Sequence, residues 1–122
     1  MSVATGALRA QQDETTSGYH QSWFPVALAS EVNAACRAPI EEAGLGEHFR
    51  HRMGHGIGLD VHEKPFISAE DDTPLEPGMT FTDEPSIIVP GRFGVRIEDI
   101  VVCEEGGGRK LGSYPAALVA TS

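Results

Sequence analysis

Three of the five histidines in this 122-residue chain lie within one short segment, at His51, His55 and His62. Three glycines alternate with other residues around His55. In an extended segment, such a glycine face lets another backbone or a ligand come close while His55 points to the other side. The spacing of four between His51 and His55 would suit two zinc ligands on a helix, but three glycines make a helix improbable there. We therefore expect these two histidines to have different roles.

Two glutamates on predicted strands form a second group of candidate ligands. Glu84 lies in the sequence F-T-D-E-P, and Glu98 lies in G-V-R-I-E-D. Because side chains alternate along a strand, Arg96 and Glu98 share one face, and we expect Arg96 to orient the Glu98 carboxylate. An imidazole with two carboxylates suits Mn, Co, Fe or Zn and leaves positions open for a water nucleophile. Taken singly, each residue is more readily explained as part of a solvated ion pair or as polar filler.

An amphipathic helix is predicted from Val26 to Ala43, where apolar residues recur at intervals of three and four. Gly44 is well placed to end this helix. Pro39 falls inside the pattern and removes one helical hydrogen bond, so we expect it to kink or split the helix at a cost of about 3 kcal/mol.

After Gly46 the sequence changes to short β-branched or aromatic runs separated by glycine and proline, which predicts strands and turns. The strands are expected at 55–61, 79–84, 86–89 and 93–103, and the turns at 76–78, 90–91 and 106–108. Residues 1–24 are expected to form a polar lead-in, either a frayed helix or disordered, and residues 113–122 a tail.

Charge and composition exclude several classes of function. Nine Lys and Arg against eighteen Asp and Glu give a net charge of -9, which repels nucleic acid and anionic lipid surfaces. No stretch approaches the roughly 20 apolar residues that a membrane span needs. The first residues lack the pattern of a secretory signal, so the cytoplasm is the expected location.

Cys36 and Cys103 are expected to be buried, reduced thiols, since their spacing suits no metal or redox motif.

Three ordered motifs resemble the C-terminal part of the pita-bread metallopeptidases. They are H-x-x-G-H-G-I-G-L-D-V-H-E at 51–63, L-E-P-G-M-T-F-T-D-E-P at 75–85 and G-x-F-G-V-R-I-E-D at 91–99. This superfamily includes methionine aminopeptidases, Xaa-Pro aminopeptidases and prolidases, and H-E-x-P with V-R-I-E-D resembles its proline-specific branch. The resemblance implies an α+β fold for residues 25–112: half of a pita-bread (creatinase/aminopeptidase-like) fold, with one amphipathic helix packed on a curved antiparallel sheet.

The resemblance also implies a role for each candidate residue. The metal ligands would be His55, Glu84 and Glu98, and the catalytic residues His62, His51, Glu84 and Arg96. His62 would contact the peptide group of the substrate, His51 would be a second substrate-side histidine, and Arg96 would be a supporting residue. The implied reaction is metal-assisted hydrolysis of an N-terminal Xaa-Pro bond, with Glu84 moving a proton.

The same resemblance implies the cofactor and the partners. The cofactor would be a divalent metal, Mn before Co, Fe or Zn. Family sites hold two metals, but this sequence lacks the two upstream aspartate ligands, so at most one metal and weak or no activity are expected of this chain alone. The partners would be a peptide with proline at its second position and either a second copy of the chain or a complementing N-terminal half. The alternative is a non-catalytic peptide- or protein-binding module, which the retained ligands disfavour.

Overall fold

The computed structural model of the chain describes residues 27–105 and 107–113. These residues form α2 (Ala29–Glu42), η1 (Gly46–His48), β1 (Gly54–Gly56), β2 (Glu63–Ile67), β3 (Thr80–Asp83), β4 (Ser86–Val89), β5 (Phe93–Arg96), β6 (Asp99–Glu104) and β7 (Gly107–Lys110). The expected lead-in at 1–24 and nearly all of the expected tail lie outside the described residues. No helix in the described ranges is long and apolar enough to cross a membrane.

The predicted helix is present as α2, and glycine ends it. The N–H of Leu45 donates to the carbonyl of Ile40 at 3.0 Å, and the N–H of Gly44 donates to that of Glu41 at 2.9 Å. These two bonds form a Schellman motif, which requires a left-handed residue after the helix. Gly44 fills that position with a φ of 71°, so the predicted role of this glycine is confirmed.

The expectation that Pro39 would split the helix is wrong, because α2 is continuous through it. Pro39 lies in the last turn, so only one hydrogen bond, to the carbonyl of Ala35, is lost there. Cys36 and Ile40 on either side of it are 1% and 0% exposed and hold the helix against the core. Packing of the apolar face therefore outweighs the missing bond.

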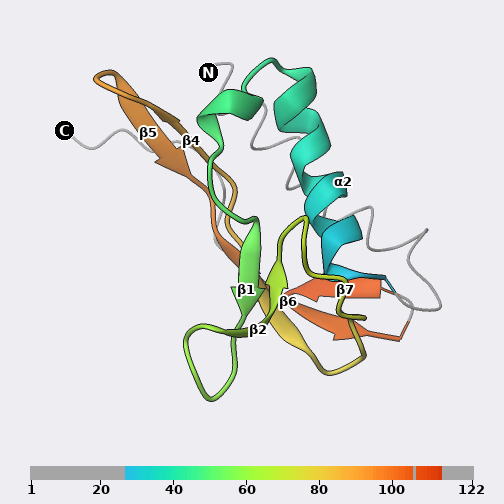
Figure 1. Ribbon diagram of the computed structural model, residues 1–122. Coiled ribbons are helices and arrows are strands. Elements are labelled where there is room, and N and C mark those ends of the chain that lie inside the picture. The colour runs from blue at the N-terminus through green and yellow to red at the C-terminus, as the bar shows by residue number, and fades with distance from the viewer. Residues whose placement is uncertain (1–26, 106, 114–122) are drawn as a thin grey trace.

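Five strands form the main antiparallel sheet, in the order β2-β1-β3-β6-β7, and β4 pairs with β5 in a separate hairpin. Figure 1 shows α2 beside the main sheet and the hairpin extending away from it. One core joins the two layers: Val32 and Ile40 from α2 are buried in the same cluster as Ile67, Phe81 and Val101 from the strands. The expected architecture of one helix packed on a curved antiparallel sheet is therefore confirmed for the described residues.

Several predicted strand boundaries are wrong. The strand expected at 55–61 is only Gly54–Gly56, and residues 57–62 form a loop, the long loop at the bottom of Figure 1. The strands β2 and β7 were not predicted. The strand expected at 93–103 is divided between the two sheets as β5 and β6.

Pro85 explains that division. The register places Asp83 opposite Asp99 in one sheet and Ser86 opposite Arg96 in the other, so it continues unbroken across the gap. Within the gap, the N–H of Ile97 donates to the carbonyl of Pro85 at 3.2 Å. Proline has no N–H for the return bond, so the ladder is interrupted there.

Candidate metal centre

Two glycines of β1 allow its neighbours to come unusually close. A Cβ atom on Gly54 would lie 1.7 Å from the carbonyl oxygen of Thr82, and one on Gly56 would lie 2.5 Å from that of Lys64. Any side chain at either position would therefore push the strands apart. The predicted close approach at the glycine face is confirmed, and His55 stands between these two glycines.

The side chains of His55 and Glu84 meet inside the protein. Their Nε2 and Oε1 atoms lie 2.9 Å apart, and the two side chains are only 10% and 12% exposed. The Nδ1 atom of His55 lies 2.9 Å from the carbonyl oxygen of Gly56. A carbonyl only accepts, so Nδ1 carries the hydrogen, and in the neutral ring the lone pair of Nε2 faces the carboxylate. A cation, either a proton or a metal ion, is needed between them.

This donor pair fits a divalent metal. A metal-ligating histidine usually donates its other ring N–H to a carbonyl or carboxylate, which fixes the tautomer and leaves the ligating nitrogen free. His55 has that arrangement through Gly56. An imidazole nitrogen and a carboxylate oxygen are ligands for Mn, Fe, Co and Zn alike.

Thr82 links these two side chains, and the sequence did not indicate it. Its hydroxyl donates to Oε1 of Glu84 at 2.6 Å, and its Oγ1 accepts from the backbone N–H of His55 at 3.1 Å. Thr82 is 2% exposed, so no bulk water competes for these bonds. Its position two residues before Glu84, on the same face of a predicted strand, is the signal by which it was recognisable.

Arg96 contacts Glu84 and not its expected partner. Its Nη1 atom lies 3.3 Å from Oε2 of Glu84, whereas the ion pairs of the described residues include none between Arg96 and Glu98. The register explains the contact, because Arg96 stands opposite Ser86 and is therefore a diagonal neighbour of Glu84. The expectation that Arg96 orients Glu98 is corrected to an ion pair with Glu84.

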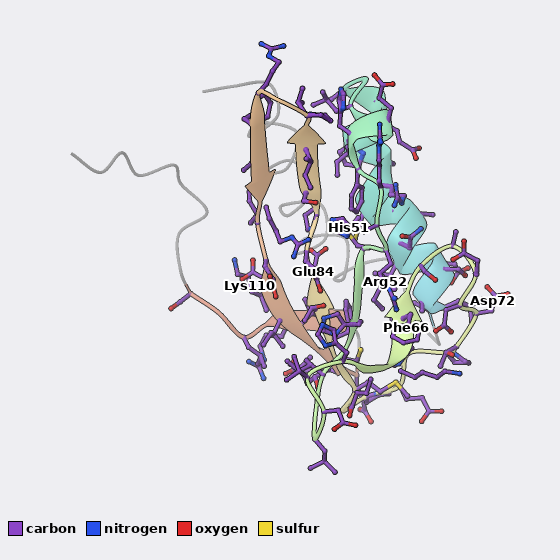
Figure 2. The ribbon with its side chains drawn as sticks, turned by 60° about the vertical axis from the view of Figure 1, so that its left-hand side comes forward. His51, Arg52, Phe66, Asp72, Glu84 and Lys110 are labelled. Atoms are coloured by element: carbon purple, nitrogen blue, oxygen red, sulfur yellow. The ribbon has the colours of Figure 1, made fainter. Side chains whose placement is uncertain are left out.

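His51 lies at the other end of the same polar network. Its Nδ1–H donates to the carbonyl of Arg52 at 2.6 Å, and its Nε2 accepts from the hydroxyl of Ser86, which is 2% exposed. Arg96 approaches the same Nε2 with its Nη2 atom at 3.5 Å. Figure 2 shows His51 and Glu84 close together between the hairpin and α2. Ser86 is the second network residue that the sequence did not indicate.

The remaining two candidates are exposed. The ring of His62 lies against that of His55, with the centroids 4.3 Å apart. Glu98 stands in the gap between β5 and β6, where the continuing register places it opposite Glu84. The described part of the chain contains no group of three or more His, Cys, Asp or Glu side chains arranged to hold a metal ion. The structure thus brings together His55, His62 and Glu84 but does not add Glu98 to a common ligand group.

Residues 13–105 match the model of metallopeptidase family M24. The chain therefore belongs to this divalent-metal-dependent family.

Individual relatives are dipeptidases. The chain is 52% identical over 95 residues to the probable dipeptidase PepE of Mycobacterium tuberculosis, covering 78% of this chain and 25% of that protein. It is 46% identical over 87 residues to the Xaa-Pro dipeptidase of Pyrococcus furiosus, covering 71% and 25%. The crystal structure of dipeptidase PepE from Mycobacterium ulcerans superposes with a TM-score of 0.86 at 44% identity, over 94% of this chain and 30% of that one. The expected pita-bread architecture is confirmed, and the chain spans about a quarter of the length of these curated relatives.

Proposed function

We propose that the chain forms part of a peptidase that hydrolyses N-terminal Xaa-Pro bonds. The observation that carries the proposal is the buried contact between His55 and Glu84, whose facing lone pairs require a cation. The similarity to a dipeptidase and to an Xaa-Pro dipeptidase supports the substrate class.

Under this proposal His55, Glu84 and Glu98 hold a divalent metal, with Mn as the first candidate. When bound, the metal polarises the scissile carbonyl and lowers the pKa of a water molecule. The place of Glu98 opposite Glu84 in the register supports its inclusion. Co, Fe and Zn remain acceptable to the same ligands.

The surrounding residues orient the substrate and the carboxylate. Arg96 and Thr82 hold the two oxygens of Glu84 from opposite sides, so its position is set before substrate binds. Glu84 then takes and returns a proton during hydrolysis. His62 is exposed beside His55 and is available to the peptide group. His51 reaches the substrate only if a substrate group replaces the Ser86 hydroxyl at its Nε2 atom.

We also propose that further ligands come from outside this sequence, from a complementing N-terminal half or from a second copy of the chain. The cytoplasm is the proposed location. Cys36 and Cys103 form no disulfide in the described residues.

Calorimetry with Mn(II) and Zn(II) tests the metal site directly. The chain is expected to bind close to one metal, and His55→Ala, Glu84→Ala and Glu98→Ala are each expected to abolish binding. His48→Ala is the matched control, because His48 lies in η1 and its Nε2 atom pairs with Glu47, which is not a candidate site residue. Binding that survives Glu98→Ala alone removes Glu98 from the site, and binding indifferent to all three substitutions overturns the proposal.

Hydrolysis is measured separately, with an Ala-Pro dipeptide and an Ala-Ala dipeptide compared in the presence of Mn(II). Preference for Ala-Pro supports the Xaa-Pro assignment. Metal binding with no hydrolysis, even with the complementing half present, favours a non-catalytic binding module.

A further inference from the structure

A second candidate site lies in a cavity of about 350 Å³ on the α2 side of the molecule. Its walls come from α2, from residues 50–52 and from residues 68–70 after β2. Three arginines line it: Arg37, Arg50 and Arg52. Such a concentration of positive charge is unexpected in a chain of net charge -9.

None of these arginines forms an ion pair within the part of the chain that the structure describes. Arg37 donates through Nη1 to the carbonyl of Phe49 at 3.2 Å and through Nη2 to that of His51 at 2.6 Å. Arg50 donates through Nε to the carbonyl of Glu47 at 2.9 Å. Neutral carbonyls satisfy hydrogen bonds but leave the positive charge of each guanidinium uncompensated.

Two of the guanidinium groups are held in place by aromatic rings. The Cζ atom of Arg37 lies 4.1 Å from the ring centroid of Phe49, and that of Arg52 lies 4.1 Å from the ring centroid of Phe66. Figure 2 shows Arg52 and Phe66 side by side. Stacking restricts these side chains before any ligand arrives, which reduces the entropy lost on binding.

A buried acceptor without a partner lines the same cavity. Asn33 is only 3% exposed, and its Oδ1 atom has no hydrogen-bond partner among the described residues. Buried polar atoms are nearly always paired, so an unpaired acceptor indicates a missing donor. A ligand that complements this lining therefore carries a negative charge for the arginines and an O–H or N–H donor for Oδ1 of Asn33. The carboxylate of Glu70, which is exposed, is the single negative side chain of the lining.

We propose that this cavity is an oxyanion site, distinct from the candidate metal centre, that accepts a phosphate group. Phosphate is the simplest ligand that combines negatively charged oxygens for arginine with an O–H for Asn33 near neutral pH. Planar guanidinium groups match the geometry of its oxygens. The site shares one lining residue, His51, with the polar network around Glu84.

Titration calorimetry of the whole chain with inorganic phosphate, in buffer containing a chelator, tests this site. Saturable binding with a dissociation constant on the order of 1 mM is expected. Sulfate has no O–H at neutral pH and cannot donate to Asn33, so it is expected to bind several-fold more weakly. Phosphate that fails to saturate, or sulfate that binds equally well, overturns the proposal.

Substitutions then locate the binding. Arg50→Gln and Arg52→Gln are each expected to weaken phosphate binding by about 5- to 10-fold, since each removes one charge-assisted contact. Arg92→Gln is the matched control, because Arg92 lies in the β4–β5 turn and is not part of the lining. His55→Ala is expected to leave phosphate binding unchanged. A loss in His55→Ala that equals the loss in Arg52→Gln would assign the phosphate to the metal centre and overturn a separate site.

Discussion

The Nε2 atom of His55, in β1, and the Oε1 atom of Glu84, the residue that follows β3, lie 2.9 Å apart, and β1 and β3 are neighbours in the main sheet. The carbonyl of Gly56 fixes the hydrogen of His55 on Nδ1, so this distance joins two electron-rich atoms unless a cation lies between them. The arrangement is pre-formed by backbone contacts on both sides of His55. Its role is tested by a substitution that removes the charge of Glu84 and keeps the shape of its side chain.

Glu84→Gln is such a change. The side-chain amide is able to donate to Nε2 of His55, so thermal stability is expected to stay within about 1 kcal/mol of the unaltered chain. Affinity for Mn(II) is expected to fall by at least about 100-fold, because an anionic ligand is replaced by a neutral one. Calorimetry and thermal unfolding measure the two effects on the same sample. Undiminished Mn(II) affinity would remove Glu84 from the set of ligands.

Thr82 is expected to act as a positioning residue for the same centre. Thr82→Val keeps the shape of the side chain but leaves a buried carboxylate oxygen and the N–H of His55 without their partner, at a cost of about 1–3 kcal/mol. Mn(II) affinity is expected to fall by about 10- to 100-fold. Thr82→Ser restores the hydroxyl and should recover most of both losses. If the serine variant behaves like the valine variant, packing of the methyl group explains the effect instead.

Gly54 is expected to tolerate no side chain. A Cβ atom added at this position would lie 1.7 Å from the carbonyl oxygen of Thr82, which forces the strands β1 and β3 apart. Gly54→Ala should therefore destabilise the protein by more than about 3 kcal/mol or prevent folding. Gly94→Ala, in β5, is the matched control, since its nearest neighbour would be a side-chain atom at 3.8 Å. Denaturant unfolding should find the control within about 0.5 kcal/mol of the unaltered chain.

Asp71 is expected to make stability depend on pH in the acid range. The hydroxyl of Thr73 and the backbone N–H of Phe66 donate to its carboxylate and lower its pKa below the usual 3.8. The stabilisation is therefore complete above pH 3.8 and is lost as pH falls through the lowered pKa of the folded state. Asp71→Asn should cost about 1 kcal/mol at pH 7 and less at pH 3. An equal cost at both values would show that the charge of Asp71 is irrelevant.

The thiol of Cys103 is expected to react slowly. Burial raises its pKa from 9.0 to about 11. Since the thiolate is the reactive form, modification at pH 8 should be about 100-fold slower in the folded chain than in denaturant. The neutral thiol also favours the folded state below pH 9, and this contribution is lost as pH rises toward 11. Equal rates of modification with and without denaturant would contradict the burial.

Much of the fold was predictable from local patterns. The turn at Gly44 and the strand β4 were found at the expected positions because glycine punctuation and β-branched runs report local structure. The strand β2 was missed because Pro65 lies inside it. Proline is tolerated there since β2 is an edge strand with a partner on one side only. The strand β7 was missed because its glycines resemble a turn.

The candidate site was predictable in part, for a related physical reason. The motifs pointed to His55 and Glu84, and Thr82 shares a strand face with Glu84. The bond between Thr82 and the backbone of His55, and that between Ser86 and His51, became visible only when the strands were paired, because such contacts depend on register. The partner of Arg96 was mistaken because alternation along one strand says nothing about diagonal neighbours on the next.

The missing N–H of Pro85 also affects how firmly the β4–β5 hairpin is joined to the main sheet. Between the two ladders, Ile97 and Pro85 are joined by the one backbone bond from Ile97, because proline cannot donate the second bond of the pair. We therefore expect this pair to open more readily than the pairs of the intact ladder between β3 and β6, and Arg96 lies on the hairpin side of it. Opening of this pair would move Arg96 away from the carboxylate of Glu84, and the positive charge beside the candidate metal centre would then be lower. Hydrogen exchange should be faster at the amide of Ile97 than at that of Val101, within the intact ladder of β6.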